Sequence, residues 1–336
     1  MTDPIAIFEA AYSLVGDEAG WLARVVRTIR GDHDDDSWVA AFTYDAKKPD
    51  LPRASALCGI DARAASIALR QLFAPVWSYS SRAQLWRMNF IGTLSSFPAA
   101  YRRLGVDETC VREFEALLES VLAQWRLGDE LWVNASDPTG MGCCIIASMR
   151  RRGPIGSREK HRWSCVAAHV ATAFRIRRQF SLRGPTSSAG TTPAPEAILD
   201  PDCSVQHAER PAADGRARAS LRQAVQAMDR ARGALRRRNA DEAVATWRAL
   251  VSGRWSLLDH FDSDGRRFVI AHRNDAKVPD ERALTLRERQ VLAYAGLGHS
   301  NKVIAYELGL STSTVSSHLT RARAKLRLAS WGALSA

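Results

Sequence analysis

The stretch "GHSNKVIAYELGLSTSTVSSHLTRARAKLRL", residues 298–328, decides the interpretation of this chain. Seven of the ten residues from Ser311 to Thr320 are serine or threonine, although the spacing of the apolar residues predicts a helix there. Hydroxyl side chains compete for backbone hydrogen bonds and are only moderate helix formers. A helix of this composition therefore indicates a face built for something other than helix stability.

The predicted helix after Ser311 has two distinct faces. Counted at about 100° per residue from Val315, the side chains of Leu319, Ala322 and Leu326 fall within about 40° and form an apolar stripe. The opposite face is small and polar and has basic borders, and its members are Ser313, Ser316, Ser317, Thr320, Ala324, Arg321, Arg323, Lys325 and Arg327. A helix that enters the major groove of DNA needs such a face, because short side chains permit close approach, hydroxyls bond base edges and cations meet phosphates.

Capping residues divide the region into three short helices. Thr285 and Glu288 form a capping box at the first helix start, and Gly298 suits the left-handed position that ends this helix. Ser300 caps the second helix and Gly309 ends it. A third helix then follows, so the segment predicts a compact helical domain over residues 280–336.

These residues carry a resemblance to a known family. The segment "LTLRERQVLAYAGLGHSNKVIAYELGLSTSTVSSHLTRARAKLRL", residues 284–328, resembles the LuxR-type helix-turn-helix of bacterial transcription regulators. The recurring pattern is L-T-x-R-E-x-x-V-L, then G-x-S-N-K-x-I-A-x-x-L, then S-x-x-T-V-x-x-H-L and K-L. The resemblance implies a regulator that binds double-stranded DNA and is not an enzyme.

The resemblance also implies roles for individual residues. Ser316, Ser317 and Thr320 occupy the base-facing positions, and Asn301 and Lys302 open the scaffold helix near the phosphates. Thr314 and His318 occupy positions of backbone-positioning or scaffold residues. With the outward residues counted above, the predicted DNA-binding set is Asn301, Lys302, Ser313, Thr314, Ser316, Ser317, His318, Thr320, Arg321, Arg323 and Lys325. Two departures concern which sequence is recognised: Ser316 replaces a frequent lysine and Val303 a frequent acid.

Charge favours the same kind of partner. The formal net charge is +11, and the segment from Glu281 to the end holds eight basic and three acidic residues. A single helix reads few base pairs, so we expect a homodimer on two half-sites about one helical turn apart. In the resembling family a short helix after K-L often forms the dimer contact, which here is "ASWGALSA", residues 329–336. RNA polymerase is a further expected partner.

The region before this domain predicts a mixed α+β structure. A helical segment over residues 1–30 precedes the strands "SWVAAFTYDA" and "RASALCGI". A helix over 108–125, the hairpin "ELWVNA-SDPTG-MGCCIIASM" and a long helix from Ser157 follow. This order resembles a GAF-like sensory domain over residues 1–181.

A linker and a second α+β segment come next. Residues 182–195, "LRGPTSSAGTTPAP", have the composition of a flexible linker. Residues 196–276 show a hairpin, helices and a second hairpin that turns at Asp264-Gly265, an order that resembles a PAS domain. Cys203 stands where glycine is usual in the first turn. The alternative is that this segment continues the first α+β unit. The expected fold class is multidomain, an α+β GAF/PAS-like sensory region followed by an all-α helix-turn-helix domain.

Other features favour no catalytic, metal or cofactor site. The run "GDHDDDS", residues 31–37, precedes a strand and is contiguous, as solvated charge runs usually are. The histidines show no paired spacing, and His169 is predicted to be a core or boundary residue. The arginine triplets 150–152 and 236–238 read as solvated faces. An effector pocket in the first domain would use aromatic residues, although these are more often core: Trp77, Tyr79, Trp86, Phe90 and Trp132.

Two function classes compete with a sensory DNA-binding regulator. One is a protein–protein signalling adaptor whose helix-turn-helix no longer binds DNA. The other is a sigma-factor-like promoter-recognition protein, which would need a second helical domain for the −10 element. The N-terminus lacks a basic secretory signal, the six cysteines form no regular framework, and no apolar run reaches the roughly 20 residues of a membrane span. We therefore expect a cytoplasmic protein without membrane contact, controlled by a small-molecule or protein effector.

Overall fold

The computed structural model describes residues 3–31, 37–48, 53–59, 90–103, 105–124, 128–181, 194–276 and 284–326. The chain divides into two compact units. The first unit contains residues 1–11, 15–136 and 140–167, and the second contains 12–14, 137–139 and 168–336.

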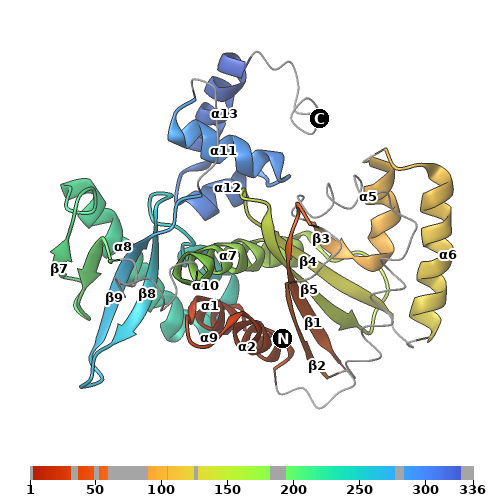
Figure 1. Cartoon of the computed structure of the whole chain (residues 1–336), viewed down its shortest axis with the longest axis horizontal. Coiled ribbons are helices and arrows are strands. Elements are labelled where there is room, and N and C mark those ends of the chain that lie inside the picture. Colours follow the sequence, from red (N-terminus) through yellow and green to blue (C-terminus); the bar gives the residue numbers. More distant parts are fainter. Residues whose placement is uncertain are drawn as a thin grey trace. The chain divides into compact units, whose positions relative to one another are not determined.

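The first unit is built on a five-stranded antiparallel sheet of order β2-β1-β5-β4-β3 (Figure 1). Its strands are β1 (Val39–Asp45), β2 (Ala54–Cys58), β3 (Ile91–Thr93), β4 (Asp129–Ser136) and β5 (Met141–Met149). Phe42 pairs with Cys144, and Trp132 pairs with Ile146. Because paired residues share a face of a sheet, these four side chains enter one hydrophobic core.

Helices cover this sheet. They are α1 (Pro4–Tyr12), α2 (Glu18–Arg30), α5 (Phe97–Arg103), α6 (Glu108–Gln124) and α7 (Ser157–Ser181). The helical segment predicted over residues 1–30 is two helices, because Gly16 adopts a φ of 76° and Asp17 caps the second helix through the amide of Gly20 at 2.8 Å. Helix α7 starts in the first unit and ends in the second.

Aromatic side chains fill the core between the sheet and α5–α6. The ring of Phe97 lies 4.4 Å from that of Phe90 and 5.2 Å from that of Trp132. Both partners were candidates for an effector pocket, and both pack into this core instead. The other pocket candidates, Trp77, Tyr79 and Trp86, and residues 32–36 of the acidic run lie outside the described residues.

The second unit contains a four-stranded antiparallel sheet of order β7-β6-β9-β8. Its strands are β6 (Ala197–Leu199), β7 (Val205–Ala208), β8 (Trp255–Phe261) and β9 (Arg267–Arg273), and the helices α8 (Gly215–Arg230), α9 (Arg236–Arg238) and α10 (Ala240–Thr246) lie between β7 and β8 in the chain. Cys203, expected at a position that favours glycine, has a left-handed φ of 62°. Gly265 has a φ of 75° in the predicted β8–β9 turn.

Three helices complete the second unit: α11 (Leu286–Gly296), α12 (Asn301–Leu308) and α13 (Thr312–Leu326). The capping box is confirmed, with the Thr285 amide donating to Glu288 at 2.8 Å and the Glu288 amide donating to Thr285 at 3.3 Å. Gly309 ends α12 in the left-handed conformation, as predicted. The core of the three helices includes Leu250, which precedes β8 and is fully buried.

Several predicted features fall on residues without described structure. Most of the 182–195 linker and the whole of "ASWGALSA" lie outside the described residues. In the part of the chain that is described, no helix is both long and apolar enough to cross a membrane. The same residues contain no group of three or more His, Cys, Asp or Glu side chains placed to hold a metal ion.

Candidate nucleic-acid interface

Helix α13 has the two faces that its sequence predicts. Val315, Leu319 and Ala322 are buried in the core shared with α11 and α12. The opposite side is exposed, and its exposed members include Ser313, Ser316, Ser317, Thr320, Arg321 and Ala324. The small hydroxyl side chains thus form an open surface, which we call the groove face.

Local hydrogen bonds hold several of these hydroxyl groups. The Ser311 hydroxyl accepts the Thr314 amide at 3.1 Å, which caps α13. The Thr320 hydroxyl donates to the Ser316 carbonyl at 3.0 Å, and the Asn301 amide group donates to the Ser316 hydroxyl at 3.2 Å. A serine or threonine hydroxyl can make more than one hydrogen bond, so these contacts orient the groups without using up their capacity.

Cations border the groove face. Lys302 and Arg321 are exposed, and neither forms an ion pair with an acid among the described residues. Lys325 instead lies 2.7 Å from a carboxylate oxygen of Glu288. This bond and the capping amide of Thr285 lower the pKa of Glu288 to about 2. Lys325 therefore already has an acidic partner in the absence of DNA.

Two predicted site residues are partly enclosed. Thr314 and His318 are half-buried, in contrast to the exposed serines beside them. The His318 Nδ1 atom is buried without a hydrogen-bond partner, and burial lowers the pKa of this ring. Because they are partly enclosed, Thr314 and His318 are better placed to support the helix itself than to contact DNA bases.

Helix α12 shows a feature that the sequence interpretation missed. Ile304, Ala305 and Leu308 face inward and belong to the core of the three helices. However, every residue from Val303 to Leu308 is buried, including those on the outer side of the helix. A signal was present on α7, where His169, Thr172 and Arg175 recur every third residue in an otherwise apolar stretch.

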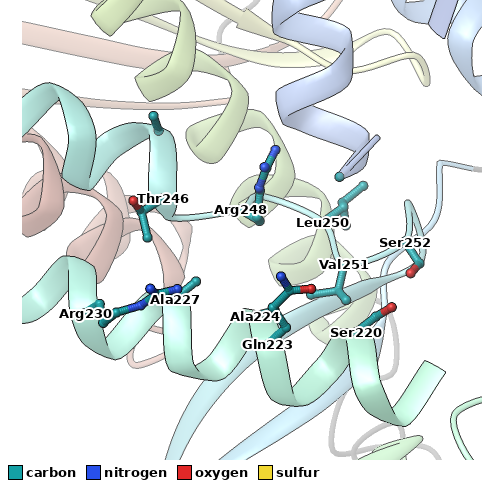
Figure 2. A pocket seen from close by; sticks show the side chains of 12 residues that line it. Ser220, Gln223, Ala224, Ala227, Arg230, Thr246, Arg248, Leu250, Val251 and Ser252 are labelled. Atoms are coloured by element: carbon teal, nitrogen blue, oxygen red, sulfur yellow. The ribbon is translucent and has the colours of Figure 1, made fainter. Parts of the chain in front are cut away.

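A groove lies between α8 and the segment from α10 to β8. It has a volume of about 370 Å³, and its wall includes Gly309 as well as Leu250, which Figure 2 labels. The side chain of Arg230 runs along α8, whereas that of Arg248 points away from this helix (Figure 2). Because the two guanidinium groups do not converge, the groove is not shaped around one anionic group.

Comparison with known proteins supports the DNA-binding assignment. Residues 282–334 match the family described as bacterial regulatory proteins, luxR family. No curated protein matches the chain. The chain thus carries a LuxR-family helix-turn-helix domain behind an α/β region with two antiparallel sheets. The presence of this domain supports the assignment of the chain as a DNA-binding transcriptional regulator. Proteins of the luxR family act by binding DNA and not by catalysis.

Proposed function

We propose that this chain regulates transcription by inserting α13 into the major groove of duplex DNA. The groove face of α13 is the observation that carries the proposal. It combines exposed small hydroxyl groups with cations at its borders, opposite an apolar stripe in which Val315, Leu319 and Ala322 are buried and Leu326 is half-buried. Such a helix approaches base edges closely while its borders meet phosphates.

Each residue of the predicted site has a role in this proposal. Ser313, Ser316, Ser317 and Thr320 meet base edges. Asn301 holds Ser316 and, with Lys302, meets the DNA backbone at the start of α12. Arg321, Arg323 and Lys325 meet phosphates, and Lys325 exchanges Glu288 for this contact. Thr314 and His318 support the helix that carries the others.

The proposal extends to assembly and control. Two copies bind two half-sites, because one such helix reads only a few base pairs. The region before the helix-turn-helix, GAF/PAS-like in its order of elements, controls binding in response to a small-molecule or protein effector. Bound near a promoter, the dimer meets RNA polymerase.

Acidic substitutions on the groove face test the proposal. We expect Ser317→Glu and Thr320→Glu each to abolish specific binding, a loss of about a hundredfold or more, because a carboxylate in the groove repels phosphates and removes a base contact. Both positions are exposed, so the free energy of unfolding should change by less than about 0.5 kcal/mol. Gel shifts would use DNA recovered from genomic fragments by the unmutated chain.

Ser263→Glu provides the matched control, because Ser263 is exposed in the β8–β9 turn and gains the same charge. It should bind like the parent. Parental affinity in either groove-face variant would show that the assigned face is wrong.

A further inference from the structure

Helix α12 is buried on two opposite sides. Its inner side, with Ile304 and Leu308, belongs to the core of the helix-turn-helix. On its outer side Val303 and Tyr306 are each 6% exposed and Glu307 is 1% exposed. One helix of a three-helix bundle normally leaves its outer side in water. The outer side of α12 therefore has a partner outside the bundle.

Tyr306 shows part of that partner. Its hydroxyl donates to the Val244 carbonyl at 2.8 Å and lies 2.5 Å from His169 Nε2. The Nδ1 atom of the same ring lies 3.2 Å from the Tyr12 hydroxyl, which also donates to the Ala249 carbonyl at 3.2 Å. Burial lowers the pKa of His169 to about 3, so the ring is neutral near pH 7.

Glu307 contacts α7 at Thr172, about one helical turn after His169. The Thr172 hydroxyl donates to its carboxylate at 2.5 Å, and the Tyr294 hydroxyl of α11 donates at 3.4 Å. Arg175, the next polar residue of the α7 series, donates to Tyr294 at 3.4 Å and lies 3.7 Å from Asp137. All these side chains are buried or nearly so, and all belong to the second unit.

This arrangement has an energetic meaning. A buried hydroxyl or carboxyl group without a hydrogen-bond partner costs roughly 1–3 kcal/mol or more. Tyr306 and Glu307 can therefore be buried at low cost only where other groups form hydrogen bonds with them. His169, Thr172 and Arg175 are spaced by three residues and therefore share one side of α7. That side offers hydrogen-bonding groups to the two polar residues on the outer side of α12.

We infer that the side of α7 with His169, Thr172 and Arg175 is a specific docking surface for α12. Through this contact α7 couples the rest of the chain to the helix-turn-helix. Helix α7 also forms part of the first unit, so a change in that unit reaches α12 along one continuous helix. The groove face stays exposed while α12 is docked, so the docked form is the DNA-binding form. The effect on DNA rests on the proposed function, whereas the docking itself does not.

Hydrogen exchange on the full chain tests the docking without DNA. Thr172→Val removes the hydroxyl that bonds Glu307 and keeps the side-chain shape, so amide exchange over residues 301–308 should rise about tenfold. Ser181→Ala is the control on the same helix, because the one hydrogen bond of the Ser181 hydroxyl among the described residues goes to the Arg177 carbonyl of α7 at 3.1 Å. It should leave exchange in α12 unchanged.

Tyr306→Phe gives a second route if Thr172→Val does not fold. It removes the contacts with His169 and Val244 while keeping the ring, and exchange in α7 around residue 169 should rise. Unchanged exchange across the α7–α12 contact in the folded variants would overturn the inference. So would an equal rise in Ser181→Ala.

DNA binding tests the coupling. With DNA recovered by the unmutated chain, Thr172→Val should bind at least about fivefold more weakly, whereas Ser181→Ala should bind normally. Faster exchange in α12 with unaltered DNA affinity would refute the coupling. If the unmutated chain binds no DNA, the proposed function fails, while the exchange result still decides the docking.

Discussion

At the scale of single residues, Glu307 is the least expected side chain of the helix-turn-helix. Burial raises the pKa of its carboxyl to about 7, while hydrogen bonds from Thr172 and Tyr294 and the charge of Arg175 act in the opposite direction. Asp137 adds a repulsive charge, and the carboxyl has no cation within ion-pair distance among the described residues. Glu307 is therefore close to half protonated near neutral pH.

This pKa has a defined consequence for stability. Between pH 4.5 and about 7 the folded chain holds more of the Glu307 proton than the unfolded chain does. The contribution of Glu307 to the free energy of unfolding therefore falls as pH rises through this window, by on the order of 1–3 kcal/mol. Glu307→Gln, which mimics the protonated form, should remove this contribution.

The measurement is urea unfolding of parent and variant between pH 5 and pH 8. His169 acts in the opposite sense, because its lowered pKa makes stability rise with pH below about 6.5. The difference between the two proteins cancels that effect. The free energy of unfolding of Glu307→Gln minus that of the parent should be larger at pH 8 than at pH 5. A difference that does not depend on pH would contradict the account.

At the scale of secondary-structure elements, the end of α12 depends on one glycine. Gly309 has a φ of 64°, and a Cβ atom there would lie 2.7 Å from the Leu250 carbonyl oxygen. Gly309→Ala should therefore lower the free energy of unfolding by about 2 kcal/mol or more, since both backbone strain and the close contact oppose alanine. Denaturant unfolding of the full chain measures this change.

Gly296→Ala is the matched control for Gly309→Ala. Gly296 is the last residue of α11, and an added Cβ would meet nothing within 4 Å. This substitution should be neutral or stabilising by up to about 1 kcal/mol. Equal destabilisation by the two variants would mean that the α12 turn does not need a left-handed residue.

The helix-turn-helix was predictable from sequence because its signals are local. The capping box at Thr285, the left-handed Gly309 and the stripe through Val315 each depend on residues within a few positions, and the structure confirms all three. The outer side of α12 was not predictable in this way. Tyr306 and Glu307 find their partners on α7 more than 130 residues earlier. His169, Thr172 and Arg175 do recur every third residue on α7, but this spacing does not identify the helix that they contact.

The same distinction applies to the strands. The hairpin β4–β5 was evident from its own turn, but the sheet order β2-β1-β5-β4-β3 depends on pairing between distant segments. In the site, the exposure of Ser317 followed from helical geometry. The ion pair of Lys325 with Glu288 joins α13 to α11 between residues 37 positions apart, and the sequence did not predict it.

At the scale of the whole molecule, a LuxR-family domain shares one compact unit with residues 168–276. Leu250 enters the helix-turn-helix core, and α7 carries the partners of α12. The helix-turn-helix is thus packed into a larger unit together with residues 168–276. In our proposal this packing lets the region before it control an exposed groove face.

The affinity of the full chain for duplex DNA at increasing salt tests the central claim most directly. Four phosphate-contacting cations in each of two copies, Lys302, Arg321, Arg323 and Lys325, predict a slope of about −7 for the logarithm of the binding constant against that of the salt concentration. Lys302→Gln should reduce the size of this slope by about 2. DNA recovered from genomic fragments should bind about a thousandfold more tightly than unrelated duplex at physiological salt. Absence of duplex binding even at low salt, or equal affinity for recovered and unrelated DNA, would contradict the account.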